Sequence, residues 1–171
     1  MESEIDAIRQ ALGLEPHPTE GGYLRVTFTS PIAVDAAALG PPASGDRAAG
    51  SAVYYLVTRE DFSALHRLRG PEIFHFYLGD ALEMLQLHPD GAATRHRLGT
   101  DLAAGQRPQV LVPAGVWQGT RLLEGGRYAL LGTTMCPGFD WRDFELGRRE
   151  ELVQRYPAER AAILALTRQE G

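Results

Sequence analysis

The stretch LHRLRGPEIFHFYLGD, residues 65–80, places His66, Glu72 and His75 within ten residues of one another. Imidazole and carboxylate groups are common ligands of Fe, Mn, Ni and Zn. The same groups are also the usual partners in general acid–base catalysis. The stretch therefore indicates either a metal site or a metal-free acid–base pair, and the choice depends on which other side chains the fold brings to the same place.

The run EIFHFYL, residues 72–78, has the composition of a β-strand. Successive side chains of a strand point to opposite sides of the sheet. If Glu72 points inward, Phe74 and Phe76 point inward with it, and His75 points outward. A β-bulge would reverse the side of His75. We therefore expect Glu72, Phe74 and Phe76 in a ligand pocket and keep His75 as a further candidate that depends on the register.

Short β-rich runs with glycine-rich turns between them predict an all-β sandwich or barrel of antiparallel strands. No β–α–β alternation is present that would favour a parallel sheet. We expect one hairpin over 81–98, closed by Pro-Asp-Gly, and a second over 116–135, closed by Glu-Gly-Gly. The expected strands are 23–29, 51–57, 72–78, 81–87, 92–98, 109–113, 116–123 and 127–135.

Helices are predicted at both ends of the chain. Ser3 is suited to cap a helix that ends at Gly13, and the segment 147–169 is helical with a break at Pro157. The segment 30–50 is rich in Ala, Gly and Pro and predicts a long surface loop. We expect a single domain over residues 1–171, with a core of about 20–146.

Composition narrows the function classes. A chain of 171 residues with 44% hydrophobic residues suits one buried core. All 17 basic residues are Arg, so a Schiff-base lysine and a P-loop lysine are excluded. A net charge of −5 without a basic cluster argues against nucleic acid as a partner. With Cys136 as the only cysteine, and no signal peptide or membrane-spanning run, we expect a cytoplasmic protein without membrane contact.

Two motifs in this chain resemble those of the cupins. The first cupin motif has two histidines separated by one residue, then after three or four residues a glutamate, then after six intervening residues a glycine. The corresponding residues here are His66, Leu68, Glu72 and Gly79. The second motif is Pro-x-Gly-x-x-His, and the corresponding residues here are Pro113, Gly115 and Gln118.

Four segments between His17 and Leu146 are similar to those of the cupin-5 branch, a domain of unknown function. They are HPTEGGYLR, HRLRGPEIFHFYLGD, VPAGVWQG and CPGFDWRDFEL. The resemblance implies a double-stranded β-helix, the RmlC-like jelly-roll barrel, with a pocket in the barrel mouth and commonly a homodimer. It also implies that the segment with Glu20 before the two glycines, and Tyr23 and Arg25 after them, borders the pocket or the dimer interface.

The cupin metal site uses three imidazoles and a carboxylate, and this chain departs from that set at two positions. Leu68 cannot bind a metal, and Gln118 offers only an amide oxygen. His66 and Glu72 are too few for a tight site unless His75 adds a third ligand. We therefore expect no cofactor. The alternative is a divalent metal bound by His66, Glu72 and Gln118.

The leading hypothesis is a small-molecule pocket that works as a metal-independent isomerase or epimerase on a sugar-like or carboxylate ligand. His66 is the expected base, and a hydrogen bond from Glu72 would orient its ring and raise its basicity. Gln118 would then donate an N–H to a substrate oxygen.

Two alternatives remain open. One is a metal-dependent cupin oxygenase or isomerase. The other is a non-catalytic dimeric protein whose pocket binds a metabolite without transforming it. If His66, Glu72 and Gln118 have a structural role alone, they bond one another and plug the barrel. An enzyme that excludes water would benefit from a closing loop, and residues 30–50 could provide it. An ordered segment far from the barrel mouth would favour the non-catalytic alternative.

Overall fold

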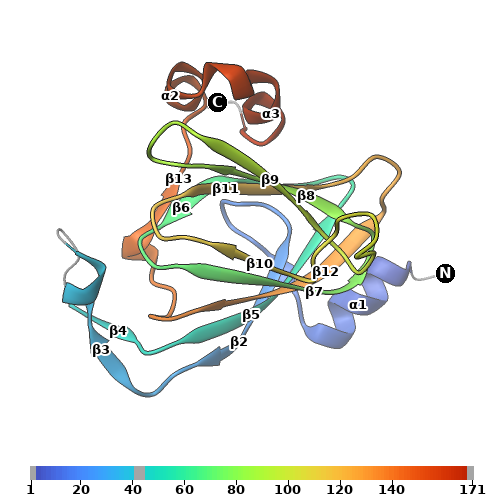
Figure 1. Ribbon diagram of the computed structural model, residues 1–171. Helices are drawn as coiled ribbons and strands as arrows, with labels where there is room; N and C mark the ends of the chain where they lie inside the picture. The colour runs from blue at the N-terminus through green and yellow to red at the C-terminus, as the bar shows by residue number, and fades with distance from the viewer. Residues whose placement is uncertain (1–2, 41–44, 169–171) are drawn as a thin grey trace.

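The computed structural model describes residues 3–40 and 45–168, and two antiparallel sheets face each other in it to form a barrel (Figure 1). The strand order is β1-β2-β5-β12-β7-β10 in the six-stranded sheet and β13-β6-β11-β8-β9 in the five-stranded sheet. The prediction of an all-β jelly-roll barrel with helices near both ends is confirmed.

The elements have the following bounds. The six-stranded sheet consists of β1 (Glu15–Pro16), β2 (Tyr23–Thr29), β5 (Ser51–Thr58), β12 (Tyr128–Met135), β7 (Glu72–Gly79) and β10 (Gln109–Val112). The five-stranded sheet consists of β13 (Phe144–Leu146), β6 (Ser63–Leu68), β11 (Trp117–Leu122), β8 (Leu82–Leu87) and β9 (Ala93–Leu98). A separate hairpin pairs β3 (Ala33–Asp35) with β4 (Asp46–Ala48). The helices are α1 (Glu4–Leu12), α2 (Arg149–Arg155) and α3 (Arg160–Ala165), and the 3-10 turns are η1 (Ala36–Leu39), η2 (Trp141–Asp143) and η3 (Pro157–Glu159).

Alternating side chains divide each sheet into an inner and an outer face. The inner faces bury an apolar core that includes Val57, Phe74, Leu82, Met84, Leu98 and Leu131. Helices α2 and α3 cover the outer face of the five-stranded sheet (Figure 1), where Trp117 packs against residues such as Leu152 and Ile163. Helix α1 packs its apolar side on Leu56 and Leu130 of the six-stranded sheet. Apolar side chains are therefore buried in three places: between the two sheets, under α2 and α3, and under α1. Burial in all three stabilises the barrel.

The predicted hairpin over 81–98 is confirmed, and the one over 116–135 is wrong. Strand β8 pairs with β9, and the N–H of Gly91 donates to the carbonyl of His88 in the turn. Strand β11 pairs with β6 and β8, whereas β12 pairs with β5 and β7. The Glu-Gly-Gly turn carries the chain from one sheet to the other. Alternation within each strand predicts its faces but does not identify its neighbour.

The surface loop predicted over 30–50 is wrong for the part of it that the structure describes. Strands β3 and β4 form a hairpin there, and its Arg47 is buried. Residues 41–44 lie outside the described residues. The sequence missed this hairpin because Ala and Gly carry no alternating pattern from which a strand could be predicted.

The chain ends follow the expected capping chemistry. Ser3 accepts a hydrogen bond from the N–H of Asp6, and Gly13 ends α1 with φ 61°. The predicted C-terminal break falls between α2 and η3, at Pro157. Among the described helices, none has the length and apolar character needed to span a membrane. The homodimer, the cytoplasmic location and the absence of a nucleic-acid partner stay predictions.

Candidate functional site

A cavity of about 180 Å³ opens between the two sheets at the barrel mouth. Strands β2, β5, β6, β7 and β12 line it together with the chain segments before β2 and before β13. Most of its surface is apolar, and its ionisable groups gather on one side. These groups are His17, Glu20, Tyr55, His66 and Glu72.

His66 is buried on β6, and its ring orientation is fixed at one nitrogen. Its Nδ1 lies 2.7 Å from the carbonyl oxygen of Ala64. Because a carbonyl oxygen can only accept, Nδ1 carries the hydrogen, and Nε2 of the neutral ring holds a free lone pair. That Nε2 lies 3.8 Å from Oε2 of Glu20. The ring also stacks on Phe144, with centroids 5.3 Å apart and planes 20° apart.

Glu20 reaches this pocket from a turn outside the barrel strands. Its Oε1 accepts a hydrogen bond from the hydroxyl of Ser63. The chain then reverses through Gly21 and Gly22, whose φ angles are 103° and 70°. A Cβ at Gly21 would lie 2.4 Å from the carbonyl oxygen of Phe62, so the turn requires glycine there.

A guanidinium from the far end of the chain holds the same turn in place. Arg168 donates from Nη1 to the carbonyl oxygen of Glu20 at 2.8 Å. Its Nη2 lies 2.5 Å from a carboxylate oxygen of Asp61. The other oxygen of Asp61 accepts the N–H of Gly22 at 2.7 Å. The position of the Glu20 turn therefore depends on Arg168, at the far end of the described chain, and on Asp61.

His17 takes the opposite tautomer to His66. Its Nδ1 accepts the N–H of Glu20 at 2.9 Å, so the hydrogen of the neutral ring sits on Nε2. This Nε2 lies 3.7 Å from Oε2 of Glu20. Burial lowers the pKa of His17, although the Glu20 carboxylate acts to raise it. A neutral His17 thus offers an N–H toward Glu20, while His66 offers a lone pair.

Glu72 is bonded to Gln118 and not to His66, so the predicted His66–Glu72 hydrogen bond is wrong. Gln118 lies opposite His66 in the β6–β11 ladder and donates from Nε2 to Oε2 of Glu72 at 2.6 Å. Burial raises the pKa of Glu72, and the nearby Glu20 adds to that rise, while His66 and hydrogen bonds from Thr133 and Gln118 oppose it. Gln118 therefore contacts the acid, and its place behind Glu72 keeps it off the pocket lining.

Of the other predicted site residues, Phe74 lines the pocket, and three residues do not. His75 faces away, with Nε2 3.0 Å from Oγ1 of Thr134. Phe76 packs against the apolar core, and Tyr23 packs beside α1 with the guanidinium of Arg9 4.1 Å from its ring centroid. Alternation along β7 therefore holds at His75.

Three aromatic side chains form one side of the pocket, and we call Phe139, Trp141 and Phe144 the aromatic wall. The ring centroids of Phe139 and Trp141 are 5.1 Å apart, and those of Trp141 and Phe144 are 5.4 Å apart. Both pairs are close to edge-to-face, the arrangement that aromatic quadrupoles favour. The wall gives the pocket an apolar side next to His66.

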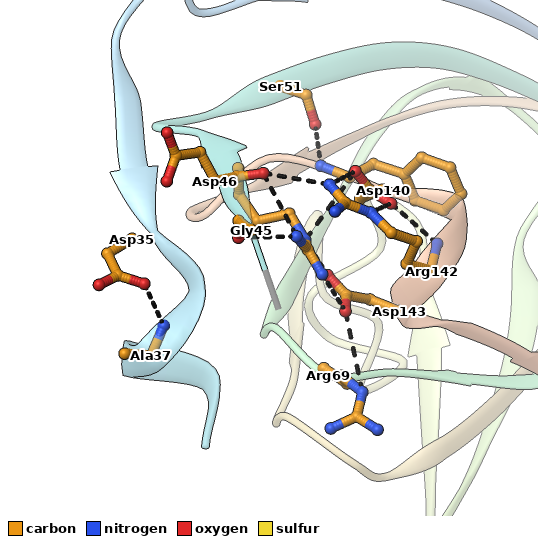
Figure 2. Close-up of polar contacts among 11 residues, drawn as sticks. Asp35, Ala37, Gly45, Asp46, Ser51, Arg69, Asp140, Arg142 and Asp143 are labelled. Atoms are coloured by element: carbon orange, nitrogen blue, oxygen red, sulfur yellow. Dashed lines mark hydrogen bonds and ion pairs between the residues drawn. The ribbon is translucent and has the colours of Figure 1, made fainter. Parts of the chain in front are cut away.

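Behind the wall lies a cluster of charged side chains, which we call the ion cluster: Arg47, Asp140, Arg142 and Asp143. Nε and Nη2 of Arg47 lie 2.7 and 2.9 Å from the two carboxylate oxygens of Asp143. Figure 2 shows Arg142 on Asp140, with 2.8 and 2.7 Å contacts from Nε and Nη2. This contact holds the pKa of Asp140 at about 2. The cluster fastens the β3–β4 hairpin to the segment that carries the wall.

The residues of this pocket do not fit the metal site that the cupin motifs imply. Leu68 stands where an imidazole would be, and Gln118 directs its amide nitrogen, which is no ligand, at Glu72. Within the described part of the chain, no group of three His, Cys, Asp or Glu side chains has an arrangement that could hold a metal ion. His66 and Glu72 therefore lack the partners that a tight site requires.

The sequence missed most of the groups around His66. His17 and Glu20 come from a turn, and the aromatic wall spans an irregular segment, the 3-10 turn η2 and the first residue of β13, so no strand period marks them. Glu20 was expected only as part of a segment that borders the pocket or the dimer interface. The available signals were the acidic residue directly before Gly21-Gly22 and the three aromatics within residues 139–144. Neither signal says which cavity the side chains enter.

Two solved structures resemble this chain over nearly its whole length. Protein SO0799 of Shewanella oneidensis is 36% identical, with a TM-score of 0.86, and the match covers 98% of this chain and 99% of that one. A hypothetical protein from Leishmania major is 28% identical, with a TM-score of 0.87, and covers 98% and 100% of the two chains. Uncharacterized protein YML079W of Saccharomyces cerevisiae is 29% identical in an alignment of length 162, and the match covers 85% of this chain and 77% of the yeast protein.

The family model of the cupin-5 group, described as cupin superfamily (DUF985), matches residues 6–147. This match includes the turn of Glu20, the strand of His66, Glu72 and the aromatic wall. It therefore covers every ionisable group that lines the pocket. By this match, and by the barrel that carries it, the chain belongs to the cupin-5 family of the cupin superfamily.

Proposed function

We propose that the pocket is the active site of a metal-independent isomerase or epimerase, in which His66 moves a proton at a carbon next to a carbonyl group. The orientation of His66 is the observation that carries the proposal. Its Nδ1–H is held by the Ala64 carbonyl, and its Nε2 lies beside Glu20 at the pocket surface. A base needs an available lone pair in a fixed direction, and this ring has one.

Glu20 takes the role that the sequence assigned to Glu72. A carboxylate near a histidine favours the charged imidazolium that forms when the ring accepts a proton. Oε2 of Glu20 lies 3.8 Å from Nε2 of His66 and 3.7 Å from Nε2 of His17. Glu20 therefore stabilises the protonated His66, while His17 orients Glu20.

In this reaction, Nε2 of His66 takes the proton from the carbon, and the C–H electron pair forms a C=C bond. The carbonyl π electrons move to oxygen, which becomes an enolate oxygen. Glu72, whose pKa burial raises, supplies a proton or hydrogen bond to that oxygen. Return of the proton from His66 to the same carbon, after the enol turns in the pocket, gives an epimer, and the enol oxygen then gives its proton back to Glu72. In an α-hydroxy carbonyl compound, return of the proton to the former carbonyl carbon gives an isomer, and the neighbouring hydroxyl then gives its proton to Glu72 as its C–O bond becomes the new C=O.

Proton exchange with solvent tests the proposal without knowledge of the natural substrate. Carbonyl compounds are incubated with the protein in D2O, and deuterium entry at carbon is followed by NMR. We expect the exchange rate of the His66→Gln variant to be at least about 100-fold below that of the wild type. This is the low end of the rate contribution that general acid–base groups make.

His75→Gln is the matched control, because His75 lies outside the pocket, and we expect full exchange from it. Equal exchange by His66→Gln and the wild type would contradict the role of His66. Ligand binding by the wild type without any exchange would contradict catalysis and leave the non-catalytic alternative.

A further inference from the structure

The pocket limits its ligand first by size. Its volume is about 180 Å³. A dry protein cavity of about 150 Å³ binds benzene, so this cavity accepts one six-membered ring with small substituents. A second ring, such as a nucleoside attached to the first, would have to lie outside it.

The apolar surface of the pocket, part of which lies next to His66, favours a ring with apolar faces. The aromatic wall lies on one side, with Phe144 parallel to the His66 ring. The barrel strands also contribute aliphatic side chains to the lining, including Leu24, Val53 and Leu68. A ring with C–H groups on its faces removes this apolar surface from water on binding.

The polar side of the pocket is rich in hydrogen-bond acceptors. Glu20 and Glu72 present carboxylate oxygens, and Nε2 of His66 presents a lone pair. The N–H of His17 points to Glu20. Ligand hydroxyl groups complement such a surface, because O–H donors form their strongest hydrogen bonds with carboxylates.

Charge excludes the other ligand class that the sequence left open. The residues that line the pocket include no Arg, and the chain contains no Lys. The guanidinium of Arg47 is bound to Asp143 behind the wall, and that of Arg168 is bound to Asp61. A ligand carboxylate or phosphate would meet the carboxylate of Glu20 beside the acidic Glu72, with no Arg or Lys in the lining to offset its charge.

We infer that the ligand of this pocket is an uncharged monosaccharide, an aldose or ketose of one ring, without phosphate, carboxylate or nucleotide. The inference rests on the proposed function only in using the same pocket. Cavity size, the aromatic wall and the surplus of acceptors carry it independently of any proton transfer. An aldose or ketose also has the carbonyl group in its open form that His66 would act on.

Ligand-detected NMR and calorimetry with the full chain test the class directly. The probes are common neutral hexoses, 6-deoxyhexoses and pentoses, each hexose paired with its uronate and its 6-phosphate. We expect saturable binding of at least one neutral sugar, with its uronate and phosphate at least about tenfold weaker. Tighter binding of an anionic member, or no binding of any neutral sugar at tens of millimolar, would overturn the inference.

Two variants separate charge from shape. In Glu20→Gln/Glu72→Gln, we expect the preference for the neutral sugar over its uronate to shrink at least about threefold, because the repelling groups are gone. In Phe144→Leu, both ligands should weaken together, so the preference should stay. An unchanged preference in the double variant would overturn the charge argument.

His66→Gln distinguishes this inference from the proposed function. If that variant and the wild type both bind the neutral sugar and neither exchanges its hydrogens, the ligand class stands and the catalytic role fails. If the wild type instead exchanges hydrogens only in an anionic substrate, proton transfer stands and the ligand class fails.

Discussion

Behind the aromatic wall, two nitrogens of Arg47 lie 2.7 and 2.9 Å from Asp143, whereas inside the pocket the Nε2 atoms of His17 and His66 lie 3.7 and 3.8 Å from one oxygen of Glu20. Both regions bring acids and bases together within a buried layer. In the ion cluster, charges satisfy one another at hydrogen-bond distance. In the pocket, the separations leave lone pairs unused.

The difference in contact distance distinguishes charged groups that stabilise the structure from ionisable groups that remain available to a ligand. A bidentate pair at short distance is tight and specific, and it leaves little capacity for a ligand. A histidine held at Nδ1 and open at Nε2 keeps that capacity. The short contacts of the ion cluster fix the wall, and the longer ones of the pocket leave room for a substrate atom.

The largest effect is expected from breaking the ion cluster. Asp143→Asn replaces an acceptor oxygen with an amide that meets the guanidinium of Arg47, and a buried cation loses its main partner. Breaking a buried pair costs about 3–5 kcal/mol. We expect about 3 kcal/mol here, because Asp140 lies 3.9 Å from Arg47 and compensates in part. Thermal unfolding should show Tm lowered by roughly 6–12 °C.

The double variant Arg47→Met/Asp143→Leu checks the physical reason for that loss. It removes both charges together, so it should recover part of the stability that Asp143→Asn loses. A double variant that is less stable than Asp143→Asn would show that packing, rather than an uncompensated charge, sets the cost.

A smaller effect, with a pH dependence, is expected from Glu72→Gln. A carboxyl whose folded pKa is raised above its ordinary value of 4.5 costs no stability below that pH, when it is protonated in both states. The cost grows as the pH rises from 4.5 through the raised folded pKa, and it then stays constant. Because Gln still accepts from Gln118, the variant should exceed the wild type in Tm by about 2–4 °C at pH 8, for about 1 kcal/mol.

The measurement is Tm of both proteins between pH 4 and pH 8. The difference should rise across that range and vanish, or change sign, at its acidic end. An equally large difference in Tm at pH 4 would mean that the charge of buried Glu72 does not lower the stability of the wild type.

The smallest effect is expected from Glu145→Gln, the exposed counterpart of the ion cluster. Glu145 pairs with Arg67 at 2.7 Å, but its side chain is 53% exposed. Exposed pairs contribute about 0–1 kcal/mol. We expect Tm to change by less than about 3 °C. A loss as large as that of Asp143→Asn would break the distinction between the two kinds of pair.

The sequence predicted the elements of the fold better than their neighbours. Strand β7 and the placement of His75 on its outer side follow from a period of two, which is a local property of the backbone. The partners of β11 and β12 depend on which sheet each strand joins. Packing across the barrel decides which sheet each strand joins. The sequence patterns of β11 and β12 are similar, so they do not distinguish the two sheets.

The candidate site was predictable only where it lies on strands. His66 and Glu72 could be singled out by motif, and both line the pocket. Glu20 could not be identified as the partner of His66, because it lies far from His66 in the sequence. It is 43 residues before Ser63, the residue of β6 whose hydroxyl donates a hydrogen bond to it. No spacing rule covers side chains from a turn. Gln118 was expected to face a substrate. It is instead buried on β11, where its amide donates to Glu72.

The contacts of Arg168 couple the segment that follows α3 to the pocket. Its guanidinium bridges the Glu20 carbonyl and Asp61, residues 148 and 107 positions away. Segments outside a barrel can open locally with less free energy than global unfolding requires. Each opening of the segment around Arg168 would release the turn that presents Glu20, so the barrel would stay folded while the pocket loses its acid. Amide exchange at Gly22, whose N–H bonds Asp61, and at Leu65, whose N–H bonds the Leu166 carbonyl, should therefore report one shared opening event.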